Sequence, residues 1–274
     1  MLVCNFCPAE WIASGAACMT SSGSKDARAV FHGRERRDPV YPLVSAGHIL
    51  FLLTMLVVIM PLAFALDPLA AAMRGHWPEP LRATALATTG FGKAQWVLVP
   101  AGLFLLSAWL IHRRNAGLWL STRQMKVAAY LFATTGSAEL LSGLLKGLFG
   151  RPRPFMIASE GAFTLNPGSV EAAFLSFPSG HATAIAASCM AVGLLWPTVR
   201  GLMLPLALWL GFTRIVSGAH HPSDVIVGLV LGAYLALIIS FVFERQGLLA
   251  FSRSAKDASA TPSEPGFAVG AALR

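Results

Sequence analysis

The stretch GFTRIVSGAHHPSDVIVG, from Gly211 to Gly228, places an arginine, two adjacent histidines and an aspartate between two apolar segments. Long apolar segments are typical of membrane-spanning helices, which need about 20 apolar residues to cross the hydrocarbon core. Arginine, histidine and aspartate are side chains that bind anions and transfer protons. The stretch therefore predicts two membrane helices joined by a turn whose residues carry out chemistry.

The composition of the whole chain is that of a membrane protein. Of its 274 residues, 55% are hydrophobic and only 12% are charged, whereas a soluble domain carries about 25% charged residues. Six apolar runs are long enough to span a bilayer, at residues 43–66, 95–111, 125–148, 180–196, 200–216 and 225–242. We therefore predict an all-α fold, a polytopic bundle of six transmembrane helices.

The segments on either side of the bundle are more polar. We predict a flexible cytoplasmic segment at residues 1–42, the membrane domain at residues 43–243, and a flexible cytoplasmic tail, rich in Ser, Ala and Pro, at residues 244–274. Glycines spaced four residues apart predict close helix packing within the membrane domain at two places, Gly143 with Gly147 and Gly228 with Gly232.

The amino-terminal region carries no strong functional signal. Residues 1–24 lack the charged-then-apolar plan of a cleavable signal peptide, and the choice between Met1 and Met19 as the start is open. Cys4 and Cys7 form a CxxC motif, but no second cysteine pair or histidine pair follows. A zinc or redox site is therefore not expected there.

The positions of the basic residues predict the orientation in the membrane. Basic side chains gather before the first span, between the second and third, and after the sixth: Arg28, Arg34, Arg36, Arg37, Arg113, Arg114, Arg123, Arg245, Arg253 and Lys256. The positive-inside rule places these segments in the cytoplasm, so the other connections face outward. The net charge of +8 comes without a basic helix or an RNA-binding aromatic pattern, so nucleic acid is not an expected partner.

Three short segments lie together at the outer ends of predicted spans: KGLFGRPRP (146–154), FPSGHAT (177–183) and TRIVSGAHHPSD (213–224). Lys146, Arg153 and Arg214 would repel one another unless a doubly charged anion such as phosphate lay between them. Ser179 and Gly180 begin a helix, whose free N–H groups attract anions. These segments therefore predict a phosphate site at the extracytoplasmic face, and their basic residues run against the positive-inside rule.

Two histidines of these segments are suited to catalysis. A neutral imidazole is a nucleophile when a carboxylate fixes its tautomer and stabilises the imidazolium that forms. Asp224 follows His220 by four residues, at the start of the last predicted helix. We therefore predict that His220 attacks phosphorus, and that His181 protonates the leaving oxygen and later deprotonates water.

The three motifs together resemble the signature of the type-2 phosphatidic acid phosphatase superfamily. The residues that match are Lys146-x6-Arg153-Pro154, Pro178-Ser179-Gly180-His181 and Arg214-x5-His220-x3-Asp224. Members of this superfamily include membrane lipid phosphatases, glucose-6-phosphatases and vanadium haloperoxidases. The motifs cover residues 146–224, and the six predicted spans match the membrane branch. Thr213 is a departure, because the family usually has serine there, but a hydroxyl is retained.

The resemblance implies a role for each motif residue. The residues that would bind phosphate are Lys146, Arg153, Ser179, Gly180 and Arg214. His220 would be the nucleophile that forms a phosphohistidine, Asp224 would orient it, and His181 would be the general acid and base. The enzyme would be a metal-independent phosphatase without a cofactor, which agrees with the lack of a carboxylate cluster in the predicted outer loops.

Residues next to the motifs receive separate interpretations. Arg151 is interpreted as steering anionic headgroups toward the site, and His221 as a neighbour that faces the headgroup. Glu139 lies about two helical turns before Lys146, and either structural pairing or a substrate or proton role fits it. The loops at 67–93 and 149–179 are expected to form a lid that selects the headgroup, the first of them as an interfacial or re-entrant segment.

The sequence therefore predicts an integral membrane lipid phosphatase in a cell inner membrane, with its site facing the periplasm. Candidate substrates are undecaprenyl pyrophosphate, phosphatidate or phosphatidylglycerophosphate, and the phosphates of lipid A. The alternative is a non-catalytic phospholipid-binding or phosphate-binding membrane protein or a transporter. A transporter would more typically show inverted repeats around a midplane site. The headgroup, the choice between mono- and diphosphate, and the oligomeric state are open.

Overall fold

The computed structural model describes residues 65–112, 122–161 and 164–251, together with Leu50, Thr54, Val57, Val58 and Pro61. Its α-helices include α2 (Glu79–Thr88), α3 (Gln95–His112), α4 (Arg123–Phe149), α5 (Ile157–Glu160), α6 (Gly180–Leu195), α7 (Arg200–Val216) and α8 (Pro222–Arg245). Short 3₁₀ turns connect them, η1 (Thr89–Gly92), η2 (Pro154–Met156), η3 (Ala172–Phe174) and η4 (Pro197–Val199). Within these residues all regular structure is helical, which confirms the predicted all-α class.

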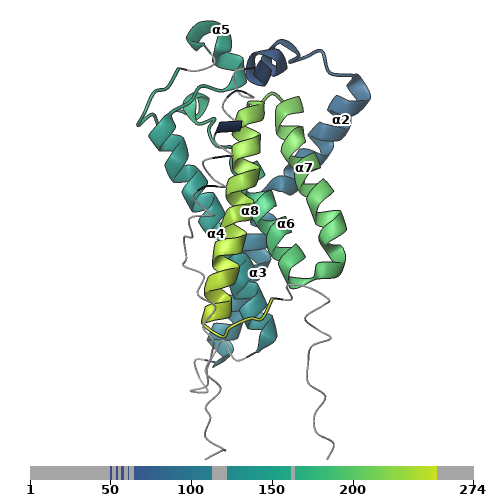
Figure 1. The fold of residues 1–274 in the computed structure, drawn as a ribbon, viewed down its shortest axis with the longest axis vertical. Helices are drawn as coiled ribbons and strands as arrows, with labels where there is room; N and C mark the ends of the chain where they lie inside the picture. Colours follow the sequence, from purple (N-terminus) through teal and green to yellow (C-terminus); the bar gives the residue numbers. More distant parts are fainter. Residues whose placement is uncertain are drawn as a thin grey trace, which may run out of the picture. The chain divides into compact units, whose positions relative to one another are not determined.

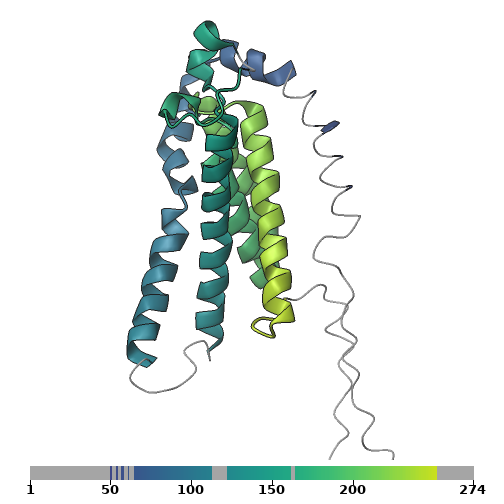
Figure 2. The same ribbon diagram turned by 90° about the vertical axis from the view of Figure 1, so that its left-hand side faces the viewer.

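The described residues belong to one compact unit, Leu43–Arg274. The other unit, Met1–Pro42, lies outside the described residues, as do most of the first predicted span and the chain after Phe251. Helices α4, α6, α7 and α8 lie side by side, and α6 packs against the other three (Figures 1 and 2). Helix α6 can occupy this central place because it is built largely from alanine, glycine, serine and threonine, which let neighbouring backbones approach.

The backbones of α6 and α8 approach each other closely at two glycines of α8. A Cβ atom on Gly232 would overlap the carbonyl oxygen of Thr183, and one on Gly228 would lie 2.8 Å from the carbonyl oxygen of Ser179. The close packing predicted for these two glycines is therefore confirmed. At Gly143, by contrast, no atom of the described residues lies within 4 Å of a Cβ position, so α4 makes no such contact there.

Three helical segments among the described residues are long and apolar enough to cross a membrane: Glu79–Ile111, Pro197–Val216 and Pro222–Arg245. Helix α6 is a shorter apolar helix, and α4 is longer, at 27 residues, but carries Glu139 and several hydroxyl side chains. Many large apolar side chains on these helices are exposed, as expected for a surface in contact with lipid. The chain is thus a membrane protein, and the count of six spans stays a prediction.

The segment 67–93, predicted as an interfacial or re-entrant loop, is partly helical. Helix α2 and η1 continue into α3 to give a single apolar run of 33 residues, Glu79–Ile111. Helix α2 packs against α7, and η1 packs against both α6 and α7. Trp209 contributes to this packing, because its Nε1–H donates to the hydroxyl of Thr88 at 3.1 Å. The second predicted span is therefore longer than its apolar core at 95–111.

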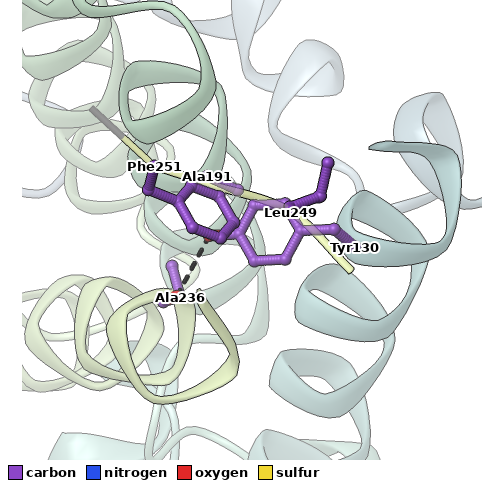
Figure 3. Close-up of a cluster of buried hydrophobic side chains, with 5 residues drawn as sticks. All are labelled: Tyr130, Ala191, Ala236, Leu249 and Phe251. Carbon is purple, nitrogen blue, oxygen red and sulfur yellow. Dashed lines mark hydrogen bonds between the residues drawn. The ribbon is translucent and has the colours of Figure 1, made fainter. Parts of the chain in front are cut away.

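A cluster of aromatic and small side chains holds the chain where it leaves α8 (Figure 3). The hydroxyl of Tyr130 donates to the carbonyl oxygen of Ala236 at 3.1 Å, and its ring lies 4.9 Å from the ring of Phe251. Leu249 and Phe251 are both buried. Packed structure therefore continues past the end of α8 to residue 251, into the segment that the sequence predicts to be a tail.

The contact between α6 and α8 can be tested with Gly232→Ala. The added methyl group has no room, so we expect it to lower the free energy of unfolding by about 1–3 kcal/mol. Gly143→Ala is the matched control, because its methyl group meets open space and alanine favours a helix by up to about 1 kcal/mol. Thermal unfolding in detergent, followed by circular dichroism, measures both. Equal midpoints for the two variants would contradict the tight contact.

Candidate active site

The three sequence motifs meet at one end of the helix bundle, where α4 and α7 end and α6 and α8 begin (Figure 1). Gly150 ends α4 in the left-handed conformation, at a φ of 57°, and its N–H bonds to the carbonyl oxygen of Lys146 at 2.9 Å. A Cβ on Gly150 would overlap the Asn166 carbonyl, so only glycine fits this turn. The turn brings Arg151 and Arg153 back toward the end of α4.

The predicted phosphate-binding residues present unused donors at this end. Ser179 is the N-cap of α6, yet its side chain caps no backbone N–H, and its buried Oγ has no partner among the described residues. The buried Nε atoms of Arg153 and Arg214 likewise lack a partner in this part of the chain. Lys146 lies within electrostatic reach of both arginines. Buried donors are normally paired, so this arrangement fits a site for an oxyanion.

Gly180 allows the lysine to approach the start of α6. A Cβ on Gly180 would lie 2.9 Å from Nζ of Lys146 and 3.7 Å from Oε2 of Glu139. The ammonium group therefore occupies the space that a side chain would fill. We call Lys146, Arg153 and Arg214 the cation cluster. Glu139 is half-buried and lies close to Lys146 of this cluster. Its role, pairing with the lysine or acting on substrate, stays open.

His220 is held by a backbone carbonyl group. Its Nδ1 lies 2.8 Å from the carbonyl oxygen of Ser176, and a carbonyl oxygen can only accept. Nδ1 therefore carries the proton in the neutral ring, which leaves the Nε2 lone pair for attack. Oδ2 of Asp224 lies 3.8 Å from Nδ1, within ion-pair distance but too far for a hydrogen bond. The Ser176 carbonyl, rather than Asp224, therefore accepts the hydrogen bond from the His220 ring.

The surroundings of His220 favour its neutral form. The side chain is only 3% exposed, and this burial lowers the pKa of the His220 imidazole. Asp224 opposes the shift, whereas the cations Arg214 and Arg153 lower the pKa further. Burial and the two arginines therefore favour the neutral form of the imidazole.

His181 lies across the site at the first turn of α6. It is half-buried, and His220, Arg214, Lys146 and Lys93 lie within electrostatic reach. A Cβ on Gly92 would lie 3.7 Å from Cδ2 of the His181 ring, so the η1 turn borders the site. The structure thus brings all eight motif residues of the sequence prediction to one end of the bundle.

Two neighbours of the motifs differ from their sequence interpretation. Arg151 is 6% exposed and forms buried ion pairs with Asp67 and Asp224, so it does not steer headgroups from the surface. His221 is 1% exposed, and its Nε2 lies 3.2 Å from the carbonyl oxygen of Pro152, so it does not face a headgroup. Both were misplaced because a basic side chain in a loop is usually solvated.

The η1 turn supplies a contact that sequence reasoning missed. Nη1 of Arg214 donates to Oγ1 of Thr89 at 2.8 Å, and the Thr213 hydroxyl donates to the same oxygen at 3.1 Å. Thr213, the departure from the family pattern, thus uses its hydroxyl within this contact. The signal in the sequence is the polar run TTGFGK (88–93) between apolar residues. Among the described residues, no group of three metal-ligating side chains is found.

A helical membrane bundle that gathers an oxyanion site and two histidines at one end defines a class, the membrane phosphatases with a histidine-containing site. The chain belongs to the PAP2 superfamily, whose family model matches residues 127–247. Lipid A 1-phosphatase of Rhizobium johnstonii is 40% identical over 63% of this chain and 72% of its own length.

Two further relatives carry related names. Lipid A 1-phosphatase of Rhizobium etli is 41% identical over 59% of this chain and 71% of its own length. Undecaprenyl-diphosphatase BcrC of Bacillus subtilis is 30% identical over 55% of this chain and 69% of its own length. The chain is therefore a membrane lipid phosphatase, a hydrolase of phosphate bonds.

The contact between Thr89 and Arg214 can be tested with Thr89→Val, which keeps the shape of the side chain and removes the acceptor. Loss of one hydrogen bond costs about 1 kcal/mol, so we expect kcat/KM for phosphate release to fall about fivefold, mainly through KM. Thr89→Ser keeps the hydroxyl and should retain most of the activity. The contact has no role in substrate binding if the valine and serine variants have the same KM.

Proposed function

We propose that this protein removes a phosphate group from a membrane lipid through a phosphohistidine intermediate on His220, without a metal ion. The observation that carries the proposal is the environment of His220. Burial lowers the pKa of the His220 imidazole and so favours its neutral form, its Nδ1–H donates to the Ser176 carbonyl, and two arginines with unpaired Nε–H groups lie within electrostatic reach. A nucleophile with a fixed tautomer next to an oxyanion site is suited to phosphoryl transfer through a covalent intermediate.

In the first step, the phosphate of the substrate binds between Lys146, Arg153 and Arg214, with the Ser179 hydroxyl and the start of α6 as further donors. Nε2 of His220 forms a bond to phosphorus, and the bond between phosphorus and the lipid oxygen breaks. The leaving oxygen takes a proton from His181, whose protonated form is favoured once the doubly charged phosphate lies beside it. The positive charge that develops on His220 is stabilised by Asp224 at 3.8 Å.

In the second step, water replaces the histidine. His181, now neutral, takes a proton from water as the water oxygen attacks phosphorus, and the P–N bond breaks. Inorganic phosphate leaves, His220 returns to its neutral form, and His181 is again protonated for the next cycle. Each residue ends the cycle as it began, so no cofactor is required.

A lipid substrate is supported by an apolar groove on the side of the helix bundle. A groove of about 430 Å³ lies between α3 and α4 and is lined by Trp96, Pro100, Phe104 and Leu131, among others. Its lining runs from Trp96, four residues after Gly92, to Arg123 at the start of α4 and Trp196 at the end of α6. We propose that a hydrocarbon chain lies along this groove while its phosphate occupies the cation cluster.

Among lipid phosphates, we favour a phosphate of lipid A. The two relatives named lipid A 1-phosphatase are 40% and 41% identical to this chain, compared with 30% for the undecaprenyl-diphosphatase. Lipid A would be reached from the periplasmic face of an inner membrane, which is the orientation that the basic residues of the sequence predict.

The test measures phosphate release by the purified full-length protein in detergent with EDTA. The panel contains lipid A, undecaprenyl pyrophosphate, phosphatidate and phosphatidylglycerophosphate. We expect lipid A to be cleaved fastest and His220→Ala to lower kcat about 10³-fold or more, as loss of a nucleophile does. Acid-labile, alkali-stable phosphate should be trapped on the wild type and absent from His220→Ala. Equal activity of the two proteins would rule out the mechanism, and a different preferred lipid would replace lipid A.

The pH dependence of kcat/KM provides a second test. The neutral His220 ring is the attacking form, so activity falls as the pH drops through its pKa. Burial lowers that pKa. We therefore expect the acid limb of the pH profile that His220 contributes to lie below the ordinary histidine pKa of about 6.5. Asp224→Asn removes the charge that raises the pKa and should move the limb to lower pH. Substrate ionisation is common to both proteins, so an unchanged limb would contradict the assignment to His220.

A further inference from the structure

We infer that Asp67, Arg151 and Ser176 are positioning residues for the His220–Asp224 pair, and we call these three residues the Asp224 support. The inference rests on the proposed function, in which His220 is the nucleophile. The three residues are buried, lie in separate segments, and do not belong to the predicted site. Their hydrogen bonds determine where the Asp224 carboxylate lies and, through Ser176, where the imidazole of His220 lies.

Both oxygens of the Asp224 carboxylate are held by other groups. Oδ1 accepts from Nη1 of Arg151 at 2.6 Å. Oδ2 accepts from the Ser176 hydroxyl at 2.6 Å and from the His221 backbone N–H at 3.0 Å. Asp224 is completely buried. The carboxylate therefore cannot turn toward His220 without giving up a hydrogen bond, and it acts on the ring from 3.8 Å.

Asp67 fixes the position of Arg151 in turn. Nη2 of Arg151 donates to Oδ2 of Asp67 at 2.7 Å, and the side chain of Asp67 is fully buried. Asp67 also accepts from the Ser223 backbone N–H at 3.0 Å and from the Ser223 hydroxyl at 2.6 Å. Ser223 lies in the first turn of α8, where a negative charge is favourable. Arg151 is thus held by both Asp67 and Asp224, and its Nη1–H donates to Asp224 from a fixed position.

Ser176 connects this arrangement to the nucleophile. Its hydroxyl donates to Asp224, while its carbonyl oxygen accepts from Nδ1 of His220 at 2.8 Å. The backbone N–H of Ser176 donates to the carbonyl oxygen of Arg151 at 3.0 Å. One residue therefore contacts the carboxylate, the nucleophilic ring and the segment that carries the arginine. A shift of Asp224 is transmitted to His220 through Ser176.

The charges in this region explain why the support affects reactivity as well as geometry. Arg151 neutralises part of the Asp224 charge, and Asp67 neutralises part of the Arg151 charge. Removing Arg151 strengthens the negative potential that the Asp224 carboxylate exerts on His220. Removing the charge of Asp67 strengthens the positive potential of Arg151 and so weakens the effect of Asp224 on His220. The charged and titratable groups that face His220 itself are Asp224, Arg214, Arg153 and His181. These are the same in all support variants, so differences between variants report on the support.

The experiment compares Asp67→Asn, Arg151→Met and Ser176→Ala in the full-length protein, with the lipid that the wild type cleaves fastest. We expect kcat to fall about 10²-fold for the first two, as small displacements of a reacting group do, and about tenfold for Ser176→Ala, which keeps its carbonyl. KM and the inhibition constant of inorganic phosphate should change little, because the cation cluster is intact. The acid limb of kcat/KM should move to higher pH in Arg151→Met and to lower pH in Asp67→Asn.

Arg82→Met is the matched control, because Arg82 forms an exposed ion pair with Glu79 and should leave all four quantities unchanged. The support is overturned if its variants match the wild type, or if they weaken phosphate inhibition as much as they lower kcat, as general loss of structure would do. Ser176→Ala removes only the hydroxyl oxygen, so it still tests the support if the charge variants do not fold.

If His220→Ala releases phosphate as fast as the wild type, the proposed function itself fails and the support with it. If His220→Ala is inactive while the support variants are normal, only the support is overturned.

Discussion

The Asp224 carboxylate holds together the segments that form the site at one end of the helix bundle. It accepts hydrogen bonds from Arg151, Ser176 and the His221 backbone, and its own carbonyl oxygen accepts from the Ser179 N–H at 3.0 Å. These partners come from the loop after α4, the loop before α6 and the start of α8. A buried carboxylate is costly unless all its lone pairs are used. Satisfying this one charge therefore brings the three sequence motifs together.

The cation cluster presents the opposite situation, because its charges are not satisfied within the described residues. Arg153 and Arg214 each keep a buried Nε–H without a partner, and Ser179 keeps a free hydroxyl at the start of α6. Mutual repulsion among the cations disfavours the empty site, and a doubly charged phosphate removes that penalty. The hydrogen-bonded network around Asp224 lies beside this cluster, and we propose that the cluster's unpaired donors bind the phosphate of the substrate.

Close packing of helices sets the position of both groups. Gly228 and Gly232 let α8 touch the backbone of α6, which fixes the start of α8, with Asp224, against the start of α6, with Ser179. The η1 turn adds a third side by placing Thr89 against Arg214. The positions of the site residues therefore depend on a small number of close contacts, those of Gly228 and Gly232 with α6 and that of Thr89 with Arg214.

The sequence by itself determined the membrane bundle and the chemical types in the site. The length of an apolar run and the spacing of a motif are local properties, so the all-α fold and the motif residues from Lys146 to Asp224 were predictable. Tertiary structure alone decided which partner each charge meets. Asp67 bonds to Ser223 over 156 residues, and Thr89 to Arg214 over 125. No local pattern encodes such pairs, because hydrogen-bond geometry at a buried carboxylate depends on how distant segments pack. Only that packing placed Arg151 inside the protein and gave His220 the carbonyl of Ser176 as its partner.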